Sequence, residues 1–219
     1  MKHLAFLAFI FTGLSASSQH EFQVWAELGT SGKVVKRLDW SLDLNSRFGN
    51  SGLETFFPQV GLEYKVKKWF RPSIDYRYIL DKDKYGNLLG AHRINFNANF
   101  EKSFKRWSSD ARVRYQYAFN RLASSESFDA DLDQSLRFKA SVKYDINNSI
   151  FTPLFNAELF YDPQFGPNGP SFSKIRMQLG SQFELKGPHK VSVKYQLDKS
   201  FEYGKDLRHV MSVSYAYKL

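Results

Sequence analysis

The sequence predicts an all-β protein: a single up-and-down antiparallel transmembrane β-barrel of about ten strands (ten to twelve), preceded by a cleaved signal peptide. Three observations lead to this fold class. Apolar and polar residues alternate with period two along most of the chain, short and long loops separate the alternating segments, and charges collect in one of the two rows. A chain that is 17% aromatic and 24% charged suits such two-faced strands.

Residues 1–18 have the pattern of a signal peptide. Met1-Lys2-His3 is a short basic region, Leu4 to Leu14 is apolar, and the small residues Ala16-Ser17-Ser18 precede Gln19. We therefore expect export through the inner membrane. The chain has no cysteine, so the exported fold cannot depend on disulfides. No later apolar run approaches about 18 residues, so a membrane crossing would have to use strands.

Residues 19–36 are assigned to an N-terminal lead-in or an extra strand, and residues 37–219 to the barrel. Phe22, Val24, Ala26 and Leu28 alternate with polar neighbours, and a break follows at Gly29 to Lys33. Three placements stay open for this segment: a strand in the wall, a segment across the lumen, or a periplasmic lead-in.

From Arg37 onward, about ten alternating segments follow in order. The least regular one runs from Phe151 to Tyr161, because Leu154 and Phe160 fall on its otherwise polar side. The apolar rows of the ten segments run over residues 38–44, 56–66, 70–80, 94–100, 111–119, 136–144, 151–161, 175–183, 191–197 and 211–219.

Loop length alternates along the chain. The short connections are Lys67-Lys68, Lys102 to Arg106, Asn147-Asn148 and Gly187-Pro188, and the long ones are Asp81 to Ala91, Arg121 to Asp133, Asp162 to Ser173 and Asp198 to Asp206. Outer-membrane barrels have short periplasmic turns and long outer loops, and both of their termini lie in the periplasm. About ten residues per strand, tilted near 45°, cover about 23 Å, close to the apolar band of about 25 Å that a membrane requires.

The last strand is expected to close the barrel and to face lipid with alternate residues. This row consists of Met211, Val213, Tyr215, Tyr217 and Leu219. Its terminal aromatic pattern resembles the signal that the barrel-assembly machinery recognises, so we expect that machinery and the outer-membrane lipids as partners. The net charge of +9 is spread singly along the segments, which argues against nucleic acid. We expect a monomer in the cell outer membrane.

The charged rows are expected to line the lumen and to interlock there as a satisfied polar core. A barrel of about ten strands is narrower than the 16 to 18 strands that leave an aqueous channel. An arginine-lined path for small anions is the functional alternative. The predicted lumen residues are Arg37, Asp39, Asp43, Arg47, Glu63, Arg71, Asp75, Arg77, Arg93, Glu101, Arg112, Arg114, Arg137, Glu158, Arg176 and Glu184.

Candidate catalytic chemistry is weak. His92 and His209 lie near the long-loop ends of their segments, where an Asp or Ser partner would be needed to build a general-base or acyl site. The acidic pattern Asp129-x-Asp131-x-Asp133 lacks the glycine and the glutamate of a calcium loop, and Asp81-x-Asp83 lacks other ligands. We expect no metal and no cofactor.

Several short motifs together resemble one bacterial family. They are Arg112-Val113-Arg114-Tyr115, Asn156-Ala157-Glu158-Leu159-Phe160, the restart Phe172 to Arg176, and the last strand opening at His209. The chain resembles the outer-membrane barrels grouped as domain of unknown function 2490, typical of the Gram-negative Bacteroidetes. The resemblance covers nearly the whole mature chain and implies a barrel in the outer membrane. It brings no known reaction or ligand, and it implies an acidic residue paired with the strand arginines, for which Glu158 is the candidate.

The expected function is an outer-membrane barrel with a structural role, or one in small-solute binding or transport through a charged, largely plugged lumen. Two alternatives remain. One is a rim enzyme that hydrolyses lipid or peptide, which would need His92 or His209 beside a Ser or Asp. The other is a soluble periplasmic lipocalin-like barrel that binds a lipophile, which would need the apolar rows to point inward.

Overall fold

The computed structural model describes residues 20–83, 85–119, 134–163, 169–201 and 207–219, so the expected signal peptide at 1–18 lies outside the described residues. None of the described residues forms a helix that could cross a membrane. They fold into eleven strands: β1 (His20–Val35), β2 (Leu38–Gly49), β3 (Gly52–Tyr64), β4 (Phe70–Lys82), β5 (Leu88–Phe104), β6 (Trp107–Phe119), β7 (Gln134–Tyr144), β8 (Phe151–Asp162), β9 (Ser171–Glu184), β10 (His189–Ser200) and β11 (Leu207–Lys218).

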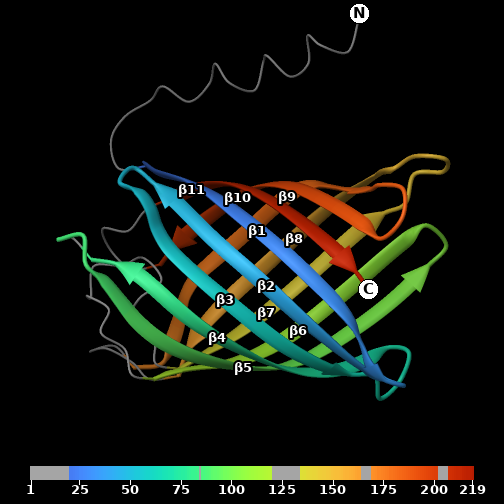
Figure 1. The fold of residues 1–219 in the computed structure, drawn as a ribbon, viewed down its shortest axis with the longest axis horizontal. Helices are drawn as coiled ribbons and strands as arrows, with labels where there is room; N and C mark the ends of the chain where they lie inside the picture. Colours follow the sequence, from blue (N-terminus) through green and yellow to red (C-terminus); the bar gives the residue numbers. More distant parts are fainter. Residues whose placement is uncertain (1–19, 84, 120–133, 164–168, 202–206) are drawn as a thin grey trace, which may run out of the picture.

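The strands form one closed barrel in which each strand pairs antiparallel with the next (Figure 1). The ring closes between β1 and β11, and this pair is parallel, with Val24 opposite Met211. An odd number of strands that run alternately up and down leaves the first and last strands pointing the same way, so one parallel seam is unavoidable. Eleven strands fall within the predicted ten to twelve.

Of the three placements considered for the N-terminal segment, β1 occupies the wall. Its residues 20–31 pair with β11 and its residues 24–35 pair with β2. The glycines that the sequence indicated as a break lie within the strand. A Cβ on Gly29 would come within 2.7 Å of the Asp43 carboxylate, and one on Gly32 within 2.8 Å of the Trp40 indole nitrogen. These glycines therefore leave room for side chains of the neighbouring strand β2.

The two ends of the barrel differ in their connections. At the short-turn end, β1–β2 and β5–β6 are joined by two residues each, with Arg37 and Lys105 at φ of 75° and 54° as tight turns require. The long-loop end carries the connections 83–87, 120–133, 163–170 and 201–206, together with one two-residue turn at 50–51. Strand β11 finishes at the short-turn end as predicted. Strand β1 instead starts at the long-loop end, beside Leu207.

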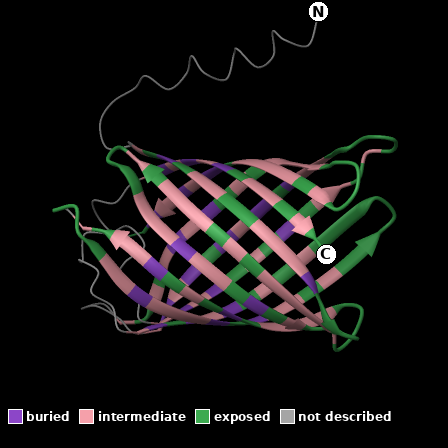
Figure 2. Cartoon of the chain, viewed as in Figure 1, coloured by how far each residue is buried: buried purple, intermediate pink, exposed green. Residues whose placement is uncertain are grey.

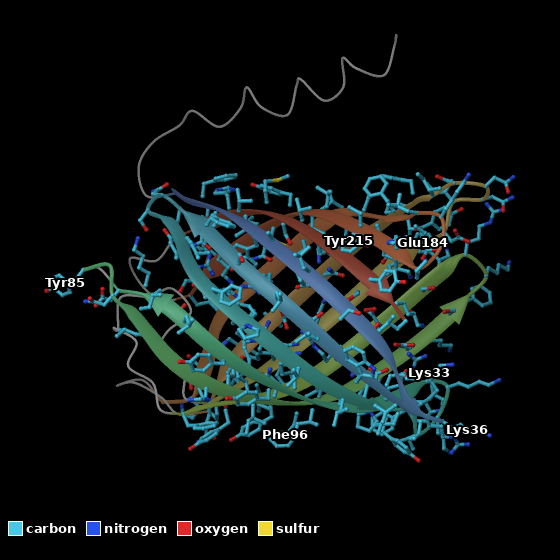
Figure 3. The ribbon with its side chains drawn as sticks, viewed as in Figure 1. Lys33, Lys36, Tyr85, Phe96, Glu184 and Tyr215 are labelled. Atoms are coloured by element: carbon cyan, nitrogen blue, oxygen red, sulfur yellow. The ribbon has the colours of Figure 1, made fainter. Side chains whose placement is uncertain are left out.

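The polarity of the wall is the reverse of that in a water-soluble barrel. The apolar row points outward and is exposed, as at Phe96 (50%) and Leu179 (64%), and Figure 3 shows Phe96 projecting away from the barrel. The polar row points inward and is buried, with Asn95, Gln196 and Asp198 all at 0% (Figure 2). The expected outward row of β11 follows this rule, since Val213 is 44% exposed while Ser212 is buried.

Aromatic side chains on the outer face gather toward both ends of the wall. Near the short-turn end, Trp69 stacks on Phe100 with ring centroids 6.2 Å apart. Near the long-loop end, the His92 ring stacks on Phe119 at 5.3 Å, and Tyr161 meets Phe172 edge-on at 5.4 Å. Paired bands of aromatic residues that flank an apolar belt are typical of barrels that sit in a bilayer.

Candidate functional site

The middle of the lumen is crossed by buried ion pairs, the first of which is centred on Glu158 in β8. Its two carboxylate oxygens accept from Arg112 Nη2 on β6 at 2.9 Å and from Arg137 Nη2 on β7 at 2.9 Å. Arg137 Nε adds a third bond at 3.1 Å. Glu158 is 4% exposed, so its charge is held by two guanidinium groups in place of water.

A second network is centred on Asp198 in β10. Arg176 on β9 binds its carboxylate in a two-pronged fork, with both N–O distances 2.8 Å, and Arg208 on β11 donates to it at 3.0 Å. Asp198 is 0% exposed. Neither Asp198 nor Arg208 was among the predicted lumen residues, because the sequence indicated a loop from Asp198 to Asp206. The period-two spacing from Lys194 through Gln196 to Asp198 is the signal that could have found it.

A third network joins β4, β5 and β6. Arg114 donates from Nη2 to the Asp75 carboxylate at 3.0 Å and from Nε to the Asn97 side-chain oxygen at 2.5 Å. Asn97 in turn donates to Asp75 at 2.9 Å. All three side chains are buried, and asparagine serves here as the bridge between two charges.

The remaining predicted lumen residues fall into three groups. Near the short-turn end, Arg71 contacts Glu101 at 3.0 Å and Glu63 at 3.6 Å.

Two other residues do not line the lumen. Arg37 is an exposed residue of the β1–β2 turn, and Glu184 is exposed at the end of β9, where it pairs with Lys190 at 2.9 Å. Alternation was extended into the turn at Arg37 and to the last residue of β9 at Glu184, where the wall ends. The third group faces inward on β2, β4 and β5: Asp39, Asp43, Arg47, Arg77 and Arg93.

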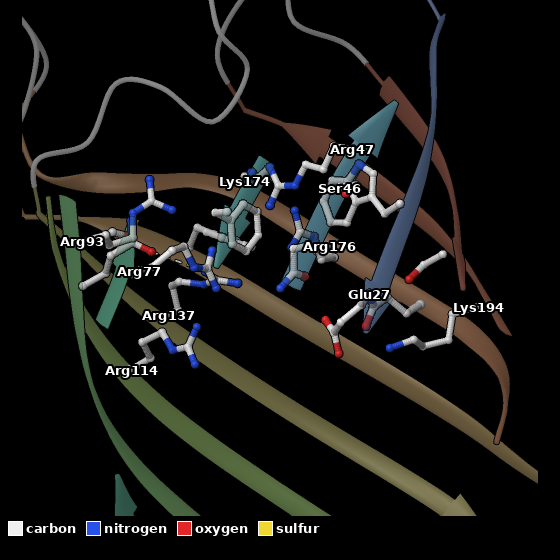
Figure 4. A pocket seen from close by; sticks show the side chains of 18 of the residues that line it. Glu27, Ser46, Arg47, Arg77, Arg93, Arg114, Arg137, Lys174, Arg176 and Lys194 are labelled. Carbon is white, nitrogen blue, oxygen red and sulfur yellow. Dashed lines mark hydrogen bonds between the residues drawn. The ribbon is translucent and has the colours of Figure 1, made fainter. Parts of the chain in front are cut away.

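A basic cavity of about 230 Å³ lies in the half of the lumen nearer the long-loop end (Figure 4). We call it the basic cavity. Its described lining contains eight cationic side chains and one carboxylate, Glu27. The residues that line it are Trp25, Ala26, Glu27, Asn45, Ser46, Arg47, Phe57, Arg77, Arg93, Arg114, Gln116, Ser135, Arg137, Phe160, Ser173, Lys174, Arg176, Gln178, Lys194, Ser200 and Ser212.

Three aromatic rings hold these cations in place. The Arg47 guanidinium lies 4.0 Å from the centroid of Trp25, Arg77 lies 4.1 Å from that of Phe57, and Arg137 lies 4.4 Å from that of Phe160. A ring face attracts a cation through its quadrupole but carries no net charge. These contacts therefore fix guanidinium groups close together without neutralising them. Phe160, which seemed misplaced on the polar side of its segment, faces inward for this role.

A second cavity of about 300 Å³ lies toward the short-turn end, and its lining is more acidic. It includes Glu63, Asp75, Glu101 and Asp110 together with Arg112 and Lys139. Arg114 lines both cavities. The Arg114–Asp75 pair therefore stands at the partition between a basic and an acidic compartment.

The family model described as "Protein of unknown function (DUF2490)" matches residues 22–206. The chain belongs to this family. The match begins inside β1 and runs past the end of β10. Most of β1, the strand that raises the number of strands from ten to eleven, is therefore part of the region that the DUF2490 model matches. A search of the curated proteins finds no match. The acid–arginine pairing that the resemblance implied is present in this DUF2490 barrel, as Glu158 with Arg112 and Arg137.

The two histidine candidates of this DUF2490 barrel are on its outer face. His92 Nδ1 bonds the Tyr76 hydroxyl at 2.6 Å, and His209 Nδ1 bonds the Tyr195 hydroxyl. Each tyrosine lies on the neighbouring strand. The His92 ring also contacts Tyr78 and Phe119, and the His209 ring lies against that of Tyr195. The bonds made by Nδ1 thus go to tyrosine and do not form the Ser or Asp pairing that a rim enzyme would need.

Metal ligation finds no support in the described part of the DUF2490 chain, where no group of three or more His, Asp or Glu side chains could hold an ion. Asp83 has a local role. It accepts hydrogen bonds from the side chain and backbone of Asn87 and from the backbone of Tyr85, and chiefly the Asn87 side-chain bond lowers the pKa of Asp83. The other acidic pattern, at 129–133, lies outside the described residues.

Proposed function

We propose that this DUF2490 chain spans the outer membrane of a Gram-negative, Bacteroidetes-type bacterium as a monomeric barrel with an occluded lumen. In this proposal the barrel holds a small polar solute in the basic cavity. One observation carries the membrane assignment. The outward apolar rows are exposed and the charged rows are sequestered inside, which is the polarity that lipid demands.

The energetics of the wall support this reading. A single Lys or Arg at the middle of a bilayer costs a barrel about 2–4 kcal/mol. The central outward positions of the described strands carry no such charge, as in the runs Leu38 to Leu44, Ile74 to Leu80 and Met211 to Tyr217. In water, the same rows would form an apolar belt around the molecule, whereas soluble monomers keep apolar patches small.

The soluble lipophile-binding alternative is not supported, because its ligand needs an apolar interior. The described interior instead holds Asn95, Gln196 and Asp198 fully buried and is crossed by ion pairs. For the rim hydrolase, the Nδ1 atoms of His92 and His209 bond outward tyrosines in place of the Ser or Asp that it needs.

A binding role, as opposed to free conduction, follows from the way the lumen is filled. The Arg114–Asp75 pair stands between the basic cavity and the second cavity, because Arg114 lines both of them and Asp75 lines the second. If the short turns face the periplasm, as in other outer-membrane barrels, the basic cavity lies toward the cell exterior. A solute would then reach it from outside.

Membrane fractionation tests this proposal. The chain is expected in the outer-membrane fraction, to resist carbonate washing, and to migrate differently on a gel before and after heating. Recovery of the mature chain as a soluble periplasmic protein after the carbonate wash would rule the proposal out. Sequencing the mature N-terminus tests the signal peptide, for which a start at Gln19 is expected.

A further inference from the structure

We propose that the basic cavity binds the phosphate group of a small water-soluble solute, inorganic phosphate or a small phosphomonoester, with Arg77 as its principal anchor. This inference rests on the proposed function, because it names the chemical class of the solute. It is carried by three features of the cavity: the contacts of Arg77, an unpartnered hydroxyl, and the cavity's size and access.

Arg77 is held in position by neutral groups. Its Nε and Nη2 atoms donate to the side-chain oxygen of Gln59 at 3.0 and 2.5 Å, and its guanidinium lies 4.1 Å from the Phe57 ring centroid. No carboxylate in the described parts of the chain lies within ion-pair distance of it. Gln59 and Phe57 fix the direction of the guanidinium without cancelling its charge, which is the arrangement of a preorganised anion site.

Most of the charged groups that act on Arg77 are cationic, although the Asp43 carboxylate also interacts with it. The charges that act on it most strongly belong to Arg93, Arg114, Arg47 and Arg137. Figure 4 shows Arg77, Arg93, Arg114 and Arg137 gathered on one side of the view, with the single lining carboxylate, Glu27, on the other. Like charges confined in a space of low dielectric repel one another, so a bound anion would relieve this repulsion.

The Ser135 hydroxyl points to the same ligand. Ser135 lines the cavity, is 1% exposed, and its Oγ atom has no hydrogen-bond partner among the described residues. Buried polar atoms without a partner are uncommon and call for an explanation. Ser135 lies on β7 two residues before Arg137 and opposite Gln116 on β6. A bound oxyanion within reach of Arg137 would supply the missing acceptor.

The geometry of the arginines favours phosphate over a carboxylate. Arg77, Arg114 and Arg137 come from three different strands and all line the basic cavity, so a ligand there is surrounded by guanidinium groups from more than one side. A carboxylate offers two oxygens in a plane and one charge. A phosphate monoester offers three free oxygens in a pyramid and a charge of about −1.5 to −2 at neutral pH, so it can accept from several guanidinium forks at once.

The size and access of the cavity limit the solute. A volume of about 230 Å³ is below the range of roughly 300–1,000 Å³ for drug-sized ligands. Phosphate or a three-carbon ester therefore suits the cavity better than a nucleotide does. The wall is paired all the way round, so the phosphate of a membrane lipid cannot enter from the side. The solute is therefore one that diffuses in through the end of the barrel.

The test is calorimetric titration of the folded, full-length mature chain in a non-ionic, phosphate-free detergent. Inorganic phosphate and glycerol 3-phosphate are the ligands, and acetate is the comparison. The wild-type chain is expected to bind both phosphates at one site and acetate about tenfold or more weakly, because acetate loses charged hydrogen bonds. Arg77→Gln is expected to weaken phosphate binding by about tenfold or more.

Arg71→Gln is the matched control, because Arg71 is a lumen arginine at the short-turn end that pairs with Glu63 and Glu101. It is expected to leave phosphate affinity within about twofold of wild type. Arg71 lies at the other end of the lumen, and its partly exposed ion pairs contribute little to the stability of the fold. Ser135→Ala is expected to weaken binding several-fold. If Arg77→Gln does not fold, Arg77→Lys replaces it and should lose most of the preference for phosphate over acetate.

The proposal is overturned if the wild-type chain binds no phosphate, if acetate binds as tightly, or if the Arg77 variant binds phosphate like wild type. Heat-modifiable migration is measured on each sample. A chain that migrates as a folded membrane barrel yet binds no phosphate would refute this inference and leave the proposed membrane location standing.

Discussion

Arg114 on β6 and Asp75 on β4 form a buried ion pair at 3.0 Å inside the barrel, across the inner face of β5. Both residues are less than 9% exposed. Arg114 also lines the cavities on either side of this pair. The pair is thus both a structural contact and part of the partition that keeps the two ends of the lumen apart.

Removal of this pair is expected to open the partition. Because a lone buried Asp75 would be costly, the variant to use is Arg114→Ser combined with Asp75→Ser. Reconstituted in planar bilayers, the wild-type chain should show little or no steady ion conductance and the double variant a clear rise. Arg71→Ser, which leaves the partition intact, should behave like wild type. Conductance of the wild type equal to that of the double variant would contradict an occluded lumen.

The Asp198 network is expected to contribute strongly to stability. Asp198→Ala leaves Arg176 and Arg208 buried beside each other without their shared acid, which should cost about 3–5 kcal/mol. Glu184→Gln removes the exposed partner of Lys190 and should cost about 0–1 kcal/mol. Urea unfolding of the detergent-folded chain measures both. Equal unfolding midpoints for the two variants would show that the buried Asp198 network adds no more to the free energy of unfolding than the exposed Glu184–Lys190 pair does.

Much of the wall could be predicted from the sequence, because period-two alternation is a local property of a strand. The rows of β2 to β11 were assigned to the correct sides for this reason. Partners across the lumen could not be predicted, since they depend on the register and shear of the whole ring. The sequence placed Arg112, Arg137 and Glu158 inside, but the fork that joins them arises only when β6, β7 and β8 align.

The errors at the ends of elements have a common cause. Glycines and polar residues indicated a loop wherever they clustered, so Gly29 and Gly32 hid the continuity of β1, and the polar run from Asp198 hid the burial of Asp198. Gly29, Gly32 and Asp198 all lie within strands in the structure. The two glycines make room for side chains on the neighbouring strand, and Asp198 can be buried because Arg176 and Arg208 pair with it. Neither neighbour is visible in a local sequence pattern.

The facing of β11 gives a prediction for membrane insertion. Val213 is outward, 44% exposed and near the middle of the strand, so Val213→Arg should place a charge in lipid at a cost of about 2–4 kcal/mol. Tyr215 lies nearer the short-turn end, where its hydroxyl bonds His189, so a charge there should cost less. Ser214→Arg points inward and is the control.

The fraction of chain that becomes heat-modifiable in the outer membrane measures insertion in these variants. The expected order of impairment is Val213→Arg, then Tyr215→Arg, then Ser214→Arg. If Ser214→Arg impairs insertion as much as Val213→Arg does, the assigned facing of β11 is wrong.

Lipid contact of the outer face can be measured directly, because the chain has no cysteine and a single one can be labelled without background. A nitroxide at Phe96→Cys, outward and 50% exposed on β5, is compared with one at Lys105→Cys in the β5–β6 turn, in reconstituted vesicles. A transmembrane barrel predicts that the label at 96 relaxes mainly through dissolved oxygen, and the label at 105 through a water-soluble nickel complex. Equal access of the nickel complex to both labels would contradict a membrane-spanning wall.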